Sequence, residues 1–206
     1  MSAQTRRGDV RKLVTLALLI AIGVVLSQLK TFPLFSNFLQ YDASGAIIVL
    51  AALLYGPAEG TLVALLVGVL RLPLIEAGSY FGIAMDVAAY LALAVPAGLL
   101  ARRLHGRRAG YAVALGAGAL CMTAAMIALN ITLTPVFWGI ARPAVMKMIV
   151  PALLPFNVVK AVVNSALAFG LYEALKKALR SETSPSPSPA ISGETASGQQ
   201  PLPPRQ

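Results

Sequence analysis

Charged side chains are scarce in this sequence. Only 12% of its 206 residues are charged, whereas 57% are hydrophobic, and the mean hydropathy is +0.75. Water-soluble domains carry about 25% charged residues, so this composition excludes an ordinary soluble fold. The apolar runs have the length of helices that cross a bilayer. The sequence therefore predicts an all-α integral membrane protein.

Metal-ligating and nucleophilic residues are also scarce. Cys121 is the only cysteine and His105 the only histidine, so one chain can form neither a disulfide nor a Cys/His metal site. The sequence has no G-x-x-x-x-G-K-[ST] phosphate loop, no H-E-x-x-H, no G-x-S-x-G and no cluster of acids suited to a metal. We expect no metal, no cofactor and no ATP hydrolysis by this chain. If a chain of this kind moved a solute uphill, the energy would have to come from another subunit or an ion gradient.

The formal net charge of +9 raises the question of nucleic-acid binding. However, the basic residues lie in short clusters between apolar runs, which is how membrane proteins distribute their topology signals. We therefore expect membrane lipid as a partner and no nucleic acid.

Six apolar runs alternate with polar, basic or proline-containing segments. The chain length allows about six spans of ~20 residues with short connections. We expect membrane helices over about residues 13–29, 43–55, 61–70, 82–101, 111–133 and 152–175. The membrane domain then covers residues 13–178, with external loops at 30–42 and 71–81. A polar N-terminus (1–12) precedes it, and a Pro/Ser-rich tail (179–206) follows that has too few apolar residues to fold.

The second and third runs could instead form one kinked span over about 46–70, because only Gly56-Pro57-Ala58-Glu59-Gly60 separates them. The positive-inside rule distinguishes the two arrangements. With six spans, the basic N-terminus, the arginine-rich loop 102–108 and the basic end of the last helix share one side. With five spans, that loop lies opposite the N-terminus. We therefore predict six transmembrane helices with both termini in the cytoplasm.

A polar stripe interrupts the last apolar run. Asn157, Lys160 and Asn164 are spaced by three and four residues, so they project from one helical face. A lysine at the centre of a membrane helix costs at least ~2.5–3.5 kcal/mol, so it needs a pocket, a partner or a pathway. Asn130 and Thr134 of the fifth run lie at the same depth by count. Together the two helices can offer amides and an ammonium to one cavity in the outer leaflet.

Several aromatic residues are near enough in sequence to line such a cavity, namely Phe81, Phe137, Trp138 and Phe156. The polar stripe also has structural interpretations. Transmembrane Asn and Thr often bond only to neighbouring helices, and Lys160 could form an ion pair with Asp86 of the fourth run. For Asp42, capping of the second helix is expected, because a helix N-terminus favours an anion.

Two other classes of protein fit parts of this pattern. A small intramembrane enzyme could use Asp86 and Lys160 as acid and base, although no third residue would orient them. A scaffold or assembly protein would need no small ligand at all. In the first run, Ala17 and Ala21 share one helical face, where small side chains let another helix approach. That spacing can also be ordinary composition.

The order of these motifs resembles the membrane-embedded substrate-binding subunits (S components) of energy-coupling factor vitamin transporters, and most closely their riboflavin-specific branch. The resemblance covers about residues 11–178. It depends on five stretches: Ala17–Ala21, Leu39–Ser44, Leu53–Gly60, Asn130 followed by Pro135, and Pro155–Lys160, the last being the most specific.

The resemblance implies six helices, a bacterial cell membrane location and a riboflavin pocket near the outer surface, with binding but no chemical conversion. It also implies association with a transmembrane coupling subunit, contacted through Ala17 and Ala21, and with two cytoplasmic ATPases. By matching motif, Asn130, Asn157 and Lys160 are the ligand's hydrogen-bonding groups. Further expected contacts are Thr134, Asn164, Phe156, Trp138 and Phe81. An S component for another vitamin or small metabolite is the alternative, since the scaffold would be the same.

The chain departs from the riboflavin branch at the start of the second helix. Where that branch usually reads aspartate-x-serine-aspartate-x-proline, this chain has Asp42-Ala43-Ser44-Gly45-Ala46-Ile47. The second acid and the proline are absent.

Overall fold

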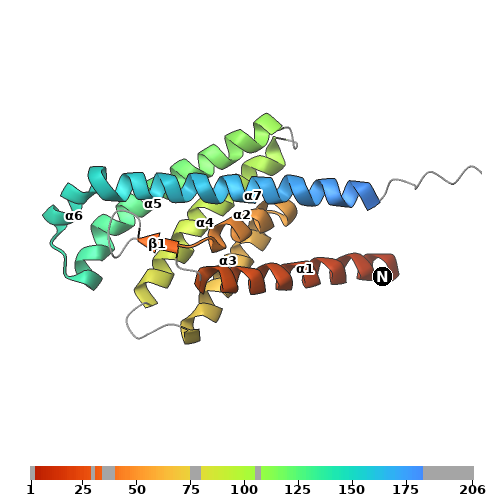
Figure 1. The fold of residues 1–206 in the computed structure, drawn as a ribbon, viewed down its shortest axis with the longest axis horizontal. Coiled ribbons are helices and arrows are strands. Elements are labelled where there is room, and N and C mark those ends of the chain that lie inside the picture. The colour runs from red at the N-terminus through yellow and green to blue at the C-terminus, as the bar shows by residue number, and fades with distance from the viewer. Residues whose placement is uncertain (1–2, 29–30, 34–39, 75–79, 105–107, 183–206) are drawn as a thin grey trace, which may run out of the picture.

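The protein is a bundle of long helices (Figure 1). The computed structural model describes residues 3–28, 31–33, 40–74, 80–104 and 108–182. The long helices are α1 (Ala3–Gln28), α2 (Ser44–Tyr55), α3 (Pro57–Arg71), α4 (Tyr80–Arg103), α5 (Arg108–Trp138) and α7 (Leu154–Glu182). Five segments of the described chain are long and apolar enough to cross a membrane, and α2 is a shorter apolar helix. The predicted helical membrane bundle is confirmed.

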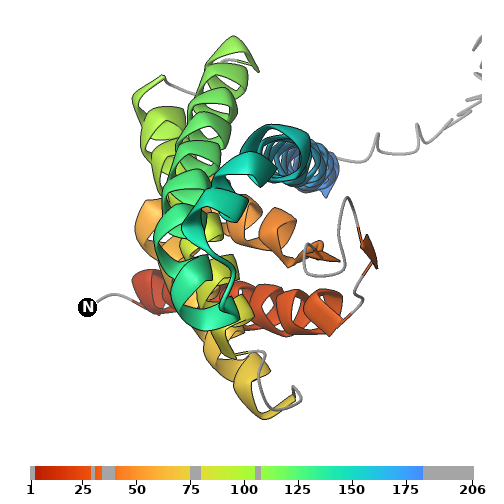
Figure 2. The same cartoon turned by 90° about the vertical axis from the view of Figure 1, so that its left-hand side faces the viewer.

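Shorter elements connect these helices. A 3-10 turn (η1, Leu72–Leu74) follows α3, whereas α6 (Arg142–Met148) and a π-helical segment (η2, Ile149–Leu153) precede α7. Figure 2 shows α6 bridging the ends of α5 and α7. Between α1 and α2, β1 (Thr31–Pro33) pairs antiparallel with β2 (Gln40–Tyr41). The sequence predicted a loop there and missed this small hairpin.

Gly56 separates α2 from α3. Its φ of +112° lies in the region that glycine tolerates and other residues rarely adopt, and Pro57 begins the next helix, where its missing N–H costs nothing. The opposite ends of the two helices meet again, since Arg71 reaches Asp42 at 3.5 Å. Helices α2 and α3 therefore run antiparallel and do not form one continuous kinked helix.

Helix α2 lies at the centre of the bundle. Residues 44–53 are all buried, and α2 contacts α1, α3, α4 and α7. Its sequence is apolar all round, as expected for a helix with neighbours on every side. The surrounding helices instead expose large apolar side chains, including Leu13, Leu120 and Val162. In a membrane protein these exposed faces contact lipid.

Helices α1, α5 and α7 extend well beyond their predicted spans. Helix α1 begins at Ala3 rather than near residue 13, and α5 continues through Pro135 to Trp138. Helix α7 continues to Glu182, so the first four residues of the expected tail are helical. Hydropathy marks where a helix leaves the apolar layer, whereas backbone hydrogen bonding can continue into water. Residues 183–206 and His105 lie outside the described residues.

Different helix ends lie at the two ends of the bundle. The start of α1 and the end of α7 lie at one end (Figure 1), called the terminal end below. The end of α5, all of α6 and the start of α7 lie at the opposite end, called the far end.

The packing of α4 against α5 predicts a specific sensitivity at Gly118. A Cβ atom there would lie 2.5 Å from the backbone oxygen of Leu93 on α4, so Gly118→Ala must force the helices apart. Overpacking of this kind costs about 1–3 kcal/mol, and we expect a lower melting temperature in detergent. Gly116→Ala is the matched control, because nothing lies within 4 Å of that position on the same helix. Equal melting temperatures for the two variants would contradict the described packing.

Candidate functional site

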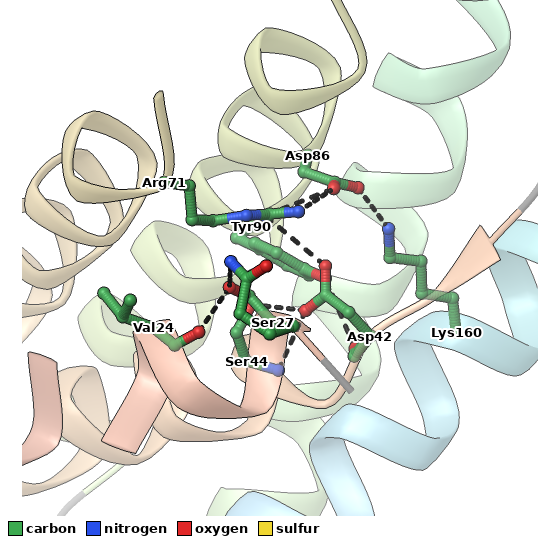
Figure 3. Close-up of polar contacts among 9 residues, drawn as sticks. Val24, Ser27, Asp42, Ser44, Arg71, Asp86, Tyr90 and Lys160 are labelled. Atoms are coloured by element: carbon green, nitrogen blue, oxygen red, sulfur yellow. Dashed lines mark hydrogen bonds and ion pairs between the residues drawn. The ribbon is translucent and has the colours of Figure 1, made fainter. Parts of the chain in front are cut away.

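Four charged side chains from four parts of the chain meet inside the bundle (Figure 3). Lys160 of α7 donates to Asp86 of α4 across 2.6 Å. Arg71, the last residue of α3, donates to the other Asp86 oxygen at 3.4 Å and to Asp42 at 3.5 Å. These residues form an alternating chain, Asp42–Arg71–Asp86–Lys160, that we call the ionic cluster. The predicted Lys160–Asp86 pair is therefore present, within a larger group.

The cluster is largely shielded from solvent. The side chains of Lys160, Asp42 and Arg71 are 4%, 5% and 8% exposed, whereas that of Asp86 is 21% exposed. A single charge at such a site is expensive to bury, and removing one partner of a buried ion pair strands the other. Here each cation touches a carboxylate, and the four formal charges sum to zero. This pairing explains how the bundle tolerates a buried lysine and a buried arginine.

Asp42 fixes one end of the cluster to the start of α2. Its Oδ1 accepts the backbone N–H of Ser44 at 2.9 Å and also the Ser44 hydroxyl, while its Oδ2 faces Arg71. The Tyr90 hydroxyl donates to the Asp42 backbone carbonyl at 3.4 Å. The N-cap position of α2 is Ala43, so Asp42 lies one residue before the predicted capping position, although its carboxylate still accepts the first N–H of the helix. The ion pair to Arg71 is an addition.

Two aromatic rings flank the Lys160 ammonium. Its Nζ lies 4.9 Å from the centroid of the buried Tyr90 ring and 5.8 Å from that of Phe156. A cation within about 6 Å of a ring centroid is attracted by the electron-rich ring face. Phe156, one of the expected aromatic contacts, is thus buried beside Lys160.

The two asparagines of the polar stripe each have one hydrogen-bonding atom without a partner among the described residues. Asn157 donates to the Leu153 carbonyl at 2.8 Å, and its buried Oδ1 accepts nothing. Asn164 accepts from the Tyr41 hydroxyl at 3.2 Å, and its buried Nδ2 donates to nothing. Most buried side-chain amides are bonded, so an acceptor on Asn157 and a donor on Asn164 are available for a ligand.

Tyr41 can act as the donor to Asn164. Burial and the neighbouring Asp42 carboxylate raise the pKa of the Tyr41 phenol above its ordinary value. The hydroxyl therefore keeps its proton throughout the physiological range. This contact joins the strand β2 to the polar stripe of α7.

Asn130 and Thr134 are buried in α5, but they bond mainly to their own helix. Asn130 donates to the Met126 carbonyl at 2.8 Å, and Thr134 donates to Asn130 Oδ1 at 3.1 Å. Helix α5 packs against α7, as the prediction of a shared site requires. The Asn130 amide would have to share or exchange these bonds in order to contact a ligand.

The remaining aromatic candidates lie near the far end of α4 and α5. Phe81 stacks on Phe137 with ring centroids 4.3 Å apart and an angle of 16° between the planes. Trp138, at the end of α5, is 51% exposed. Phe81 and Trp138 are therefore less enclosed than Phe156.

Arg71 is the main site residue that sequence reasoning misplaced. We expected it at the start of an external loop, whereas it is the buried end of α3. A signal existed, because the buried positions of α3 recur every three or four residues and the series continues to Arg71. Those positions are Gly60, Val63, Ala64, Val67 and Gly68.

Comparison with known proteins identifies the family. The family model described as "ECF transporter, substrate-specific component" matches residues 11–172. The chain belongs to this family of S components. It is 31% identical over 179 residues to the riboflavin transporter FmnP of Bacillus subtilis (strain 168), and the match covers 81% of this chain and 93% of that protein.

A solved structure agrees with this assignment. The chain matches the structure titled "Structure and mechanism of the S component of a bacterial ECF transporter" with a TM-score of 0.73 and 25% identity. The match covers 84% of this chain and 99% of that one. The S component is an integral membrane transport subunit, so the alternatives of an intramembrane enzyme and an assembly protein are wrong.

The structure also explains the departure at Gly45 of this S component. A Cβ atom at that position would overlap the Tyr90 ring and lie 2.8 Å from Asn164 Nδ2. Tyr90 and Asn164 occupy the space that an aspartate side chain would need. The acids of the ionic cluster are accordingly Asp42 and Asp86.

The ionic cluster predicts that Arg71→Gln is strongly destabilising. The change leaves Asp42 unpaired and Asp86 with Lys160 alone, and breaking a buried ion pair costs about 3–5 kcal/mol. The control is Arg108→Gln, because Arg108 is 86% exposed and pairs with Glu173 at 3.4 Å. An exposed pair contributes about 0–1 kcal/mol. Thermal unfolding in detergent measures both, and a similar small loss for each variant would argue against a buried cluster.

Proposed function

We propose that this S component binds riboflavin between α7 and its neighbours at the far end of the bundle, without converting it. The observation that carries the proposal is that Asn157 and Lys160 are both buried on one face of α7. A buried acceptor atom without a partner among the described residues lies one helical turn from a buried ammonium. The similarity to a relative named as a riboflavin transporter supports the choice of ligand.

The chemistry of these groups suits a flavin. The pyrimidine edge of the ring system alternates carbonyl acceptors with an N–H donor. Asn157 Oδ1 can accept from that N–H, and an ammonium has three hydrogens, so Lys160 can donate to a carbonyl while it remains bonded to Asp86. The Asn164 amide hydrogens and the Asn130–Thr134 pair provide further polar contacts.

The apolar part of the ligand would contact the aromatic residues. Small-ligand sites bury most of the ligand against hydrophobic and aromatic side chains. The position of Phe156 beside Lys160 supports this role, and Phe81 and Trp138 would contribute nearer the far end. These residues complete the proposed binding set.

We further propose six membrane spans with both termini in the cytoplasm of a bacterial cell. Helix α2 counts as a span although it is short, because other helices surround it and shield it from lipid. The ends of α4 and α7 and the start of α5 carry basic residues, which favour the cytoplasmic side. They are Arg102, Arg103, Arg108, Lys176 and Lys177.

Transport would require a transmembrane coupling subunit and two cytoplasmic ATPases, because this sequence contains no nucleotide-binding motif. The proposed contact surface is the outward face of α1, where Ala17 and Ala21 are exposed. Small residues on an exposed face let a partner helix approach closely. The exposed apolar side chains around them on α1 are Val14, Leu18, Ile22 and Val25.

We expect the purified protein to bind riboflavin, and we expect Asn157 and Lys160 to contribute to its affinity. Protein purified from a riboflavin-containing medium should be yellow, and titration of ligand-free protein should quench flavin fluorescence at a single site. Asn157→Ala and Lys160→Ala should each weaken binding at least tenfold, about 1.4 kcal/mol, because each removes a group that the ligand would bond.

The control for these variants is Val162→Ala on the same helix, where the side chain is 54% exposed and cannot reach a buried ligand. It should bind as the wild type does. Colourless protein that does not bind riboflavin would refute the proposal and favour another vitamin or small metabolite, which a gain in melting temperature would reveal by mass action.

Assembly with the coupling subunit can be tested separately. Ala17→Leu and Ala21→Leu should reduce co-purification with the coupling subunit and ATPases, because the larger side chains keep the partner helix away. Riboflavin binding should not change. Ala112→Leu, at an exposed alanine of α5, is the control and should assemble normally. If all three variants assemble alike, α1 does not form this contact.

A further inference from the structure

Asp86 is the acid of the ionic cluster that contacts both cations, Arg71 and Lys160. One carboxylate oxygen accepts from Lys160 and the other from Arg71 (Figure 3). Asp42 forms an ion pair with Arg71, and among the described residues no hydrogen bond or ion pair joins it to Lys160. Within the described part of the chain, Asp86 is thus the acid that holds Lys160.

A lysine ammonium keeps one orientation only when a fixed hydrogen-bond partner restrains it. The ammonium sits on a flexible four-carbon stem, and both the 2.6 Å bond to Asp86 and the Tyr90 ring at 4.9 Å restrict it. The bond is charge-assisted, which makes it shorter and stronger than a neutral one. With one hydrogen fixed on Asp86, the directions of the other two are restricted as well.

Asp86 is itself held from the opposite side. Arg71 contacts its second oxygen, Asp42 contacts Arg71, and the Ser44 N–H at the start of α2 holds Asp42. Contacts with α3, α4 and the start of α2 therefore help to fix the position of the Lys160 ammonium, in addition to its own helix α7. An acid at a different distance could also balance the charge of Lys160. The chain of contacts through Arg71 and Asp42 additionally fixes where the Asp86 carboxylate lies.

From this geometry we infer that Asp86 is a positioning residue for ligand binding, which acts by orienting Lys160 toward riboflavin. The inference rests on the proposed function. It assigns to Asp86 no contact with the ligand. Its side chain is the most exposed of the cluster, at 21%, so the pair it forms with Lys160 lies at the accessible edge of the group.

A double-mutant cycle tests this inference through the dissociation constant for riboflavin. Asp86→Asn alone should weaken binding at least tenfold, because the ammonium loses its charged partner. In a Lys160→Ala background the same change should weaken binding by no more than about twofold, since there is no ammonium left to orient. Effects that multiply in the double variant, or wild-type binding by Asp86→Asn, would overturn the inference.

A conservative variant separates an effect on the position of Lys160 from an effect on folding. Asp86→Glu keeps the charge but moves the carboxylate by one methylene, so we expect binding weakened at least threefold at a nearly unchanged melting temperature. This variant also decides the matter if Asp86→Asn does not fold. Glutamate that binds as well as aspartate would mean that Asp86 provides charge alone.

The control is Asp42→Asn, which removes the other acid of the cluster. Asp42 contacts Arg71 and the first N–H of α2, so its loss should lower the melting temperature both in the wild type and in the Lys160→Ala background. Any effect of Asp42→Asn on binding should be smaller than that of Asp86→Asn. If the wild-type protein binds no riboflavin, both the proposed function and this inference fail. If it binds riboflavin but the effects of Asp86→Asn and Lys160→Ala on the dissociation constant multiply, only the inference fails.

Discussion

Buried charge must be neutralised locally, and this requirement shapes the far half of the bundle. Arg71 and Lys160 can enter the interior only because Asp42 and Asp86 meet them there. Asp42 lies just before α2, Arg71 is the last residue of α3, and Asp86 and Lys160 lie in the second turns of α4 and α7. Their pairing therefore requires four segments far apart in sequence to converge at one depth.

The central position of α2 follows from the same convergence. Helices α3, α4 and α7 all contact α2, and Asp42 links its N-terminus to the cluster. At Gly45 the packing is so close that Tyr90 and Asn164 occupy the space of a side chain. The polar stripe of α7 therefore faces the centre of the bundle, where a ligand can be enclosed.

Sequence patterns predicted the helices and the polar stripe well, because both depend on local features. Apolar runs and a spacing of three and four residues need no knowledge of the neighbouring helices. The break at Gly56 was also predictable, since a Gly-Pro pair seldom continues a helix. The burial of Asn130, Thr134, Asn157 and Asn164 agrees with the pattern, although their contact with a ligand remains a prediction.

What the sequence could not supply was the identity of long-range partners. Arg71 precedes a leucine-proline pair and so was interpreted as a loop residue, and only the arrangement of α3 against α4 shows it facing Asp86. The β1–β2 hairpin has strands of three and two residues, too short for a periodic signal. The helix ends were misjudged at residues 3–12 and 179–182 because polar residues can extend a helix beyond the bilayer.

The electrical neutrality of the ionic cluster has a consequence for a protein that works inside a membrane potential. Moving one elementary charge through 100 mV involves about 2.3 kcal/mol of electrical work. The cluster carries two positive and two negative groups within hydrogen-bonding or ion-pair distance. If the site changes its depth in the bilayer, these groups move together and their contributions cancel. With a neutral ligand, the membrane voltage then neither drives nor opposes the movement of the cluster itself.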